Sequence, residues 1–532
     1  MKFVKNVALA GLLLATPAIL HAQSQTDAYR FAVEELSGTA RYLSMGGAFG
    51  ALGGDVSVLK ANPAGLAVYR SSEIVGTLGL NSTSAKSNWN GTSEKVTNTK
   101  FNLDNIAYVG YFPTGKESGV VSWNFGLSYN RQRTFNRNYS MTTNDMNVSL
   151  SDYAAAWVTN RELAVNDIAF PNKGDYNPYN NIKNDFFSVL AYDAGYIDAY
   201  SDNDKRYYST FSENDGTPYP IDRSRLRVEE HGSIGEYDIA FGFNVSDFLM
   251  VGATMRITDM DYHYASYYTE NFSNGSFLSL GTADYPNGLS TKGTGYGVNV
   301  GVIAVPAPFL RVGVAYNSST WYRMSDYFYT KAETDVPYFD KPLISSTPEN
   351  ATFDYRYQTP DKWIFSLASV LGTRALISVD YEISNFSNMK LKDFNKYDLP
   401  ANEFIKEDFG LNQTLRAGVE FKVTPQFSLR AGGSWQSVTM SQDILDGNVE
   451  VVPAGTTVHY TLDQGVTNYT FGLGYRFTPH WYTDIACVLR THKEKAYAFS
   501  SIFTDYGEDF FNQPADLKTK TTKVALTVGY KF

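Results

Sequence analysis

Cysteine, long apolar runs and a surplus of positive charge are all missing from this sequence. Its 532 residues include a single cysteine, Cys487, which excludes an intramolecular disulfide framework. Acidic residues outnumber basic ones by 55 to 45, and the formal net charge of −10 argues against nucleic acid as a partner. After residue 22, no run reaches the roughly 18 apolar residues that a membrane-spanning helix needs. The rest of the chain is therefore either secreted or a membrane barrel built from strands.

The first residues have the pattern of a secretory signal. Lys2 and Lys5 form a basic start, Val7 to Leu20 form an apolar core, and His21-Ala22 precedes a cleavage point before Gln23. We expect residues 1–22 to be removed on export. No cysteine lies near that point, so a lipid-anchored product is not expected.

The composition that remains is typical of a transmembrane β-barrel. Tyr (39), Phe (34) and Gly (42) are abundant, while the mean hydropathy is negative at −0.29. Barrel strands expose only every second side chain to lipid, so apolar and polar residues alternate along them. The clearest example is residues 468–477, where Tyr469, Phe471, Leu473 and Tyr475 alternate with small or polar residues.

Fourteen segments show this alternation, each near the roughly 10 residues of a tilted spanning strand. They are 71–80, 104–113, 120–134, 234–246, 248–269, 293–305, 309–330, 357–371, 375–386, 413–424, 427–437, 467–478, 481–491 and 522–532. The sequence therefore predicts an all-β fold, a fourteen-stranded antiparallel barrel spanning residues 71–532. An even number of strands is what a closed bacterial barrel requires.

The connections between these segments alternate between short and long. The long ones run roughly over 81–103, 135–233, 270–292, 331–356, 387–412, 438–466 and 492–521. Outer-membrane barrels have short periplasmic turns and long extracellular loops, so this order places both chain ends in the periplasm. The longest connection, 135–233, is too long to lack structure. We expect it to form a cap over the extracellular mouth, with short helices within 144–159 and 184–199.

Residues 23–70 do not alternate in this way and are rich in glycine. Together with the strands that follow, they resemble the FadL/TodX family of outer-membrane transporters of hydrophobic compounds. The resemblance covers the whole chain after residue 22. It is carried by Asn62-Pro63-Ala64, Thr359-Pro360, the runs 415–421 and 471–477, and a C-terminal Phe532.

This resemblance implies that residues 23–70 form a hatch that plugs the barrel from the periplasmic side. Gly46, Gly47, Asn62, Pro63 and Ala64 would then be hatch or gating residues. It further implies passive transport of long-chain fatty acids or aromatic hydrocarbons, with capture outside, hatch movement and lateral release through the wall at a kinked strand. A glycine inside a strand marks such a bend in some barrels, and the third strand contains Gly126. The implied location is the outer membrane of a Gram-negative bacterium, in contact with lipid and lipopolysaccharide.

Three arginines on neighbouring strands share the lumen-facing parity: Arg416, Arg430 and Arg476. They are candidates to pair with the carboxylate of a ligand. The alternative, which we favour because barrel lumens are polar, is a network that neutralises them with Asp380, Glu382 and Glu420.

Other functional classes have weaker support in the sequence. No HExxH, Ser-His-Asp order or CxxC spacing occurs, so we expect no enzyme, no metal site and no cofactor, and we expect a monomer. The aromatic run Tyr262-His263-Tyr264, with Tyr267-Tyr268, makes a haem receptor one alternative, although an interfacial aromatic girdle explains it as well. A second alternative is a shuttle for secreted proteins, as in a branch that resembles this family. A transporter should have an apolar pocket reaching the hatch and a gap in the wall, whereas a shuttle should have an exposed groove.

Overall fold

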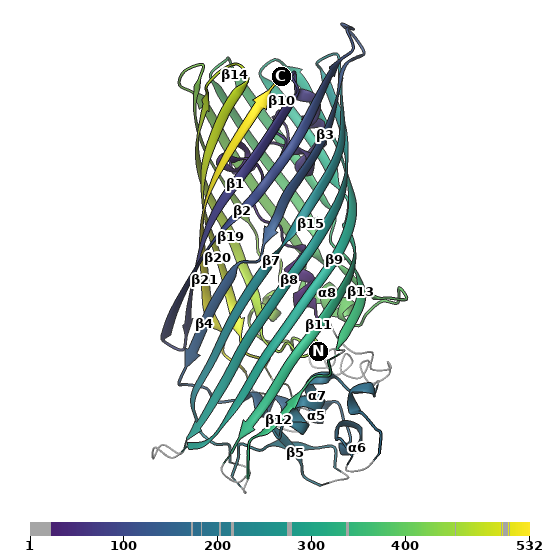
Figure 1. The fold of residues 1–532 in the computed structure, drawn as a ribbon, viewed down its shortest axis with the longest axis vertical. Helices are drawn as coiled ribbons and strands as arrows, with labels where there is room; N and C mark the ends of the chain where they lie inside the picture. Colours follow the sequence, from purple (N-terminus) through teal and green to yellow (C-terminus); the bar gives the residue numbers. More distant parts are fainter. Residues whose placement is uncertain are drawn as a thin grey trace.

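The protein is a tall closed cylinder with helices at one end and inside it (Figure 1). The computed structural model describes residues 23–532 except 172–173, 182, 202–203, 214–216, 274–278, 337–339, 350, 453, 502, 504–508 and 510. The expected signal sequence, residues 1–22, lies outside the described residues. No helix among the described residues is long and apolar enough to cross a membrane.

The wall is one antiparallel sheet of nineteen strands that closes on itself. Its first nine strands are β1 (Glu73–Trp89), β2 (Thr92–Pro113), β3 (Val120–Thr134), β4 (Arg137–Thr143), β7 (Ile221–Val245), β8 (Leu249–Ser273), β9 (Ser279–Ala307), β10 (Leu310–Asn317) and β11 (Trp321–Asp335). The other ten are β12 (Leu343–Ser346), β13 (Thr352–Gln358), β14 (Lys362–Leu371), β15 (Ala375–Asn385), β16 (Lys390–Asp393), β17 (Leu411–Lys422), β18 (Phe427–Gln436), β19 (Tyr460–Arg476), β20 (Trp481–Tyr497) and β21 (Ala515–Lys531).

Breaks divide some wall strands into collinear pieces, such as β3 with β4 and β10 with β11. Counted as whole strands, they number fourteen, and the last, β21, pairs with the first, β1, from Glu73↔Lys531 to Asn88↔Asp516. The predicted all-β, fourteen-stranded closed barrel is therefore confirmed. Closure removes the free sheet edges that would otherwise invite aggregation.

Side chains alternate between the two faces of the wall as the sequence predicts. On β19, Tyr469, Phe471 and Leu473 are exposed outward, whereas Thr470 between them is fully buried in the lumen. The exposed apolar residues gather in the half of the barrel that carries the short turns. We call this the short-turn end, where the C-terminus also lies (Figure 1), and the opposite end the long-loop end.

Two of the predicted long loops are wrong, because the strands continue through them. β1 and β2 remain paired as far as Trp89↔Thr92, and β8 and β9 as far as Ser273↔Ser279. The residues added to β1 and β2 are mostly Ser, Thr, Asn and Lys, so both of their faces are polar. Hydrophobic alternation cannot detect such strands, although their backbone hydrogen bonds are as regular as those of the apolar half.

The connection predicted to span 135–233 is shorter than expected, since β4 and β7 include its first and last residues. What remains forms a small cap at the long-loop end, seen at the bottom of Figure 1. Its elements are α5 (Leu150–Asn160), α6 (Val165–Ile168), η2 (Pro178–Asn180), α7 (Phe186–Asp193), β5 (Ile197–Ala199) and β6 (Tyr207–Ser209). α5 and α7 lie within the two segments where helices are expected. Further short helices at this end are η3 (Phe386–Asn388), α8 (Ala401–Asp408) and α9 (Gln442–Leu445).

Residues 23–70 lie inside the barrel, where Figure 1 shows them in purple. They form α2 (Gln25–Ala32), α3 (Ala40–Ser44), α4 (Val58–Ala61) and η1 (Pro63–Val68). We call them the lumen segment. α2 lies in the half of the long loops, where its Tyr29 stacks on Phe409 with the ring centroids 5.3 Å apart. η1 lies near the short-turn end, against β7, β8 and β9.

The prediction that both chain ends lie at the short-turn end is wrong for the first described residues. Gln23 is buried and donates a hydrogen bond from Nε2 to Asp326 of β11, at 3.0 Å, far along the barrel from the short turns. The alternation of short and long loops shows only at which end of the barrel β1 begins. Residues that precede a barrel strand are free to run back through the lumen, and these do so along most of its length.

Candidate functional site

Two of the glycines singled out in the lumen segment lie in a tight turn beside the wall. Gly46 (φ 64°) and Gly47 (φ 80°) both adopt the left-handed conformation that favours glycine. A Cβ atom added at Gly46 would lie 2.5 Å from the carbonyl oxygen of Gly433 on β18. A side chain at Gly46 would therefore displace the lumen segment from the wall.

Asn62 ties the lumen segment to itself and to the wall. Its Nδ2 atom donates to the carbonyl oxygens of Gly50, at 2.6 Å, and of Val302 on β9, at 3.3 Å. Its Oδ1 atom accepts from the backbone amide of Ala64 at 3.1 Å, which caps η1. The following Pro63 has its carbonyl against Gly252 on β8, where no Cβ would fit. Asn62-Pro63-Ala64 is thus a rigid corner seated on wall glycines.

Two of the three lumen arginines form ion pairs with acidic side chains. Arg430 bonds to Glu420 at 2.6 Å and to Asp484 at 2.5 Å. Arg41 of the lumen segment reaches the same Glu420 at 2.9 Å. In the same way, Arg416 pairs at 2.9 Å with Glu382 on the neighbouring strand β15. These contacts are those of a charge-neutralising network, and they occupy the groups that a ligand carboxylate would need.

Arg476 and Gly126 lie apart from these contacts. Arg476 is the last residue of β19 and is exposed at the short-turn end. Gly126 is paired on both sides, with Val109 of β2 and Ala240 of β7, without a register shift. A Cβ atom added there would lie 3.2 Å from Leu59 of the lumen segment, so Gly126 makes room for that segment.

The third wall strand is nevertheless interrupted, beyond Gly126. The β2–β3 ladder ends at Asn105↔Asn130, and the β3–β7 register shifts between Arg131 and Arg133. From Arg137 onward, β4 pairs with β7 alone. Residues 92–104 of β2 therefore pair with β1 on one side and have no ladder partner among the described residues on the other. We call this unpaired boundary between β2 and β3–β4 the wall gap.

Side chains bridge the wall gap where the backbone ladder is missing. Asn98 Nδ2 donates to Asn136 Oδ1 at 2.9 Å, and Thr142 Oγ1 donates to Glu94 Oε1 at 2.6 Å. Arg131 Nε donates across it to the carbonyl oxygen of Leu103 at 3.2 Å. Side-chain bonds of this kind break one at a time, whereas a ladder opens cooperatively. The wall is therefore weaker at this boundary than along a continuous ladder.

Two neighbouring cavities that share lining residues lie between the lumen segment and the wall, with volumes of about 90 and 110 Å³. Both border the link between α2 and α3, including Val33, Glu35 and Leu36. The larger cavity also borders Phe135 and Asn136, at the interruption of the third strand. A path therefore leads from the lumen segment to the wall gap.

Many charged side chains line these two cavities, so neither of them is the apolar pocket that is expected at the hatch. The larger cavity is bordered by six basic and four acidic side chains and His492: Arg30, Arg131, Arg133, Arg137, Arg490, Lys523, Glu35, Glu230, Asp463 and Glu494. Most of them pair with one another, as Arg137 does with Glu230 at 2.6 Å. Arg131 and Arg133 form no ion pair with any described residue. Arg131 donates to the backbone oxygen of Leu103, and Arg133 donates to those of Arg30 and Val33.

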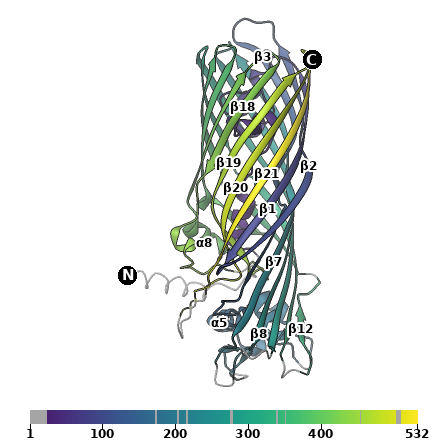
Figure 2. The same ribbon diagram turned by 90° about the vertical axis from the view of Figure 1, so that its left-hand side faces the viewer.

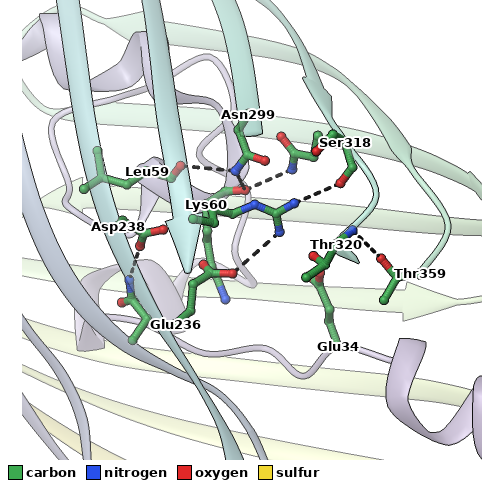
Figure 3. A network of polar contacts seen from close by, with 12 residues as sticks. Glu34, Leu59, Lys60, Glu236, Asp238, Asn299, Ser318, Thr320 and Thr359 are labelled. Carbon is green, nitrogen blue, oxygen red and sulfur yellow. Dashed lines mark hydrogen bonds and ion pairs between the residues drawn. The ribbon is translucent and has the colours of Figure 1, made fainter. Parts of the chain in front are cut away.

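A polar network holds the middle of the lumen segment, as Figure 3 shows. Asn299 of β9 donates to the carbonyl oxygen of Lys60 at 3.1 Å, and Glu34 pairs with Lys362 at 2.6 Å. Burial lowers the pKa of Lys60 to about 8, although the nearby Glu34 acts in the opposite direction. Burial raises the pKa of Glu34, but Lys362 and Lys60 outweigh it and bring that pKa to about 2. Glu34 is thus held as a carboxylate.

The aromatic run proposed for haem does not converge on one site. Tyr262 is buried in the lumen, where its ring lies 5.5 Å from that of Phe31 in α2, whereas His263 points to the other face of β8. On that face His263 stacks on His231 at 4.7 Å between ring centroids. Among the described residues, no group of three or more His, Cys, Asp or Glu side chains is placed to hold a metal ion.

Comparison with solved structures identifies the fold. The structure matches a FadL homologue of Pseudomonas aeruginosa with a TM-score of 0.53 and 12% identity, over 94% of this chain and 100% of that chain. The chain has the FadL fold. A TodX monoaromatic hydrocarbon channel, in its deltaS2 mutant form, matches with a TM-score of 0.51 and 14% identity, again over 94% and 100% of the two chains. The resemblance is thereby confirmed at the level of fold. No family model and no curated protein matches the sequence.

Sequence reasoning placed the opening of the third strand at Gly126, so it missed the position of the wall gap, and it also missed Arg133. In β3, the odd-numbered residues such as Phe125 and Tyr129 point outward, and beyond the register shift Phe135 and Tyr139 are buried instead. One extra residue at the bulge reverses the two faces. Apolar residues keep the odd positions on both sides of the bulge, although Arg131 and Arg133 interrupt them, so the pattern of apolar residues does not reveal the reversal of faces.

Proposed function

We propose that this protein is an outer-membrane channel for hydrophobic small molecules, which pass from the lumen through the wall gap into the membrane. In this proposal the long-loop end faces the exterior, the short turns face the periplasm, and the lumen segment acts as the hatch. The FadL fold supports this assignment, and so does the apolar outer surface of the half with the short turns.

The observation that carries the proposal is the end of the β2–β3 ladder at Asn105↔Asn130, beside the larger cavity. An apolar ligand gains about 25 cal/mol per Å² of surface that it removes from water. Release sideways into the membrane keeps that gain, so no energy source is required. A barrel with a continuous ladder at this point would offer no such exit.

The charged lining favours one of the two substrate classes. A pure hydrocarbon would leave the ionic groups of the larger cavity without solvation, which is costly. A long-chain fatty acid carries a carboxylate that Arg133 can bind, because its guanidinium has no acidic partner among the described residues. We therefore propose fatty acids or similar amphiphilic acids as the substrates, ahead of aromatic hydrocarbons.

The exit is tested by locking the wall gap. In a Cys487→Ser background, Asn98→Cys with Asn136→Cys places two thiols where side chains now touch at 2.9 Å. Oxidation is expected to reduce fatty acid uptake to the level of cells without the protein, and reduction should restore it. The matched control is Ser84→Cys with Thr97→Cys, whose hydroxyls lie 3.3 Å apart across the continuous β1–β2 ladder. Normal uptake through the fully cross-linked gap would refute the exit.

The substrate class is tested separately with Arg133→Gln. Uptake of a fatty acid is expected to require a higher concentration for half-maximal rate, while toluene uptake stays unchanged. An equal loss for both compounds would mean that Arg133 holds the lumen segment rather than the ligand. In that case the proposal that the substrate is an amphiphilic acid would lose its support. The proposal of an exit through the wall gap would be unaffected.

A further inference from the structure

The outer surface of the barrel carries a row of four lysines on four adjacent strands. Lys95 of β2 is the register partner of Lys86 of β1, Lys86 is the partner of Lys518 of β21, and Lys518 is the partner of Lys493 of β20. All four are exposed. The strands lie side by side in Figure 2, and at about 4.8 Å per strand the row extends over roughly 14 Å.

Such a row is unfavourable for the isolated barrel. Like charges directly opposite each other on neighbouring strands destabilise a sheet. None of the four forms an ion pair with a described residue. The acidic residues nearest in sequence bond elsewhere: Glu94 to Thr142, Glu494 to Arg137, and Asp516 to Lys495. Because acids outnumber bases in this chain by 55 to 45, an ordinary mixed surface would place acids among these lysines.

The rows on either side of the lysines form a gradient toward the apolar half of the barrel. The next row toward the short turns has Thr97, Ser84, Lys520 and Thr491 in register. Beyond it the outward residues become apolar: Leu489 is four residues from Lys493, and Leu80 and Val524 are each six residues from the row. Six residues of a tilted strand correspond to roughly 15 Å along the barrel axis.

We infer that this lysine row binds the phosphorylated headgroups of lipids in the outer leaflet. The inference depends on the proposed orientation, in which the long-loop end faces the exterior. Acyl chains would then lie on Leu80, Leu489 and Val524, the row of Thr97, Ser84, Lys520 and Thr491 would meet the sugar or glycerol portion, and the four ammonium groups would meet phosphate. A headgroup with two phosphates engages two pairs of lysines at once, which removes the repulsion along the row.

The test measures lipid binding alone, with the full-length protein in detergent and native mass spectrometry as the readout. The probes are a diphosphorylated lipid A and the same lipid after removal of its phosphates. We expect the wild-type barrel to retain the diphosphorylated form in preference. Replacing Lys86, Lys95, Lys493 and Lys518 together by Gln should weaken that binding at least about tenfold, since each lysine near an anionic surface adds to the attraction. Replacing them by Arg should preserve it.

A control variant carries the same change in charge at the same end of the barrel. It replaces four other exposed lysines by Gln: Lys341, Lys390, Lys396 and Lys406. Equal weakening in both Gln variants would overturn the inference, because net charge alone would then explain it. Binding that is insensitive to the lysine row, or equal for the phosphate-free lipid, would overturn it too. No transport is measured, so a failure of fatty acid uptake leaves these outcomes unchanged.

Discussion

Replacing Asn62 by Ala should loosen the lumen segment without opening the barrel. Asn62 is 1% exposed and makes three hydrogen bonds, to Gly50, Val302 and Ala64. At roughly 0.5–1.5 kcal/mol each, their loss costs about 2–4 kcal/mol of the free energy that keeps this corner folded in the lumen, where the bond to Val302 joins the wall and the other two lie within the segment. With about 1.4 kcal/mol per factor of ten, the undocked population rises by roughly 30- to 700-fold. Hydrogen exchange of the amides between residues 43 and 66 should accelerate by that factor, while the wall amides stay protected.

The matched control for this experiment is Asn130→Ala. Asn130 is also fully buried and also makes three hydrogen bonds, but all of them are to wall residues: Ser128, Asp238 and Asn105. This variant should leave exchange of the lumen segment unchanged. If the Asn62 variant exchanges like the wild type while its barrel remains folded, the corner at Asn62 does not hold the segment, and the reasoning fails.

Three further predictions concern charges and the cap. Arg430→Ala leaves Glu420 and Asp484 buried without their partner, so it should destabilise the barrel by about 3–5 kcal/mol in a urea titration, whereas Arg430→Lys should lose less. The pKa of Glu34 is held at about 2, below its ordinary value of 4.5, so the unfolded state binds more protons between these values. Docking of the lumen segment should therefore weaken as the pH falls from 4.5 to 2, and Glu34→Gln should reduce that dependence in exchange measurements. Glu270→Ala removes the carboxylate that accepts the amide of Leu150 at the start of α5, at 3.0 Å, so proteolysis of the cap should accelerate while the barrel stays intact.

The sequence was sufficient for those parts of the fold in which one face meets an apolar surface. β19 and its neighbours alternate clearly, and the alternation of short and long connections established the number of strands and their direction. It was insufficient where both faces are polar, as in the ends of β1 and β2 near Asn90-Gly91. The φ angles of those two residues, 44° and 87°, are positive, as in the tight turn that an Asn-Gly pair favours in a hairpin. The Asn90-Gly91 pair therefore indicated in the sequence that β1 and β2 extend as far as this turn.

The candidate site could be predicted only in part. The resemblance to the FadL/TodX family pointed to the glycines and to Asn62, and the shared parity of the arginines indicated a neutralising network with Glu382 and Glu420. The pairing of Arg430 with Glu420 and Asp484 joins three different strands, and the wall gap depends on which backbone finds no partner. Such contacts between distant residues depend on register, which a single bulge in β3 alters without changing the pattern of apolar residues.

The contacts of the lumen segment limit how far a ligand can move it. Burying roughly 200 Å² of apolar surface contributes about 5 kcal/mol, and a ligand shifts an equilibrium only by its differential affinity for the two states. Full release of the segment would break the corner at Asn62, worth about 2–4 kcal/mol by itself, and also the buried ion pair between Arg41 and Glu420. The link between α2 and α3, residues 33–39, has no regular structure and borders both cavities. A ligand therefore has enough free energy to displace this link and reach the wall gap, but not to expel the whole segment.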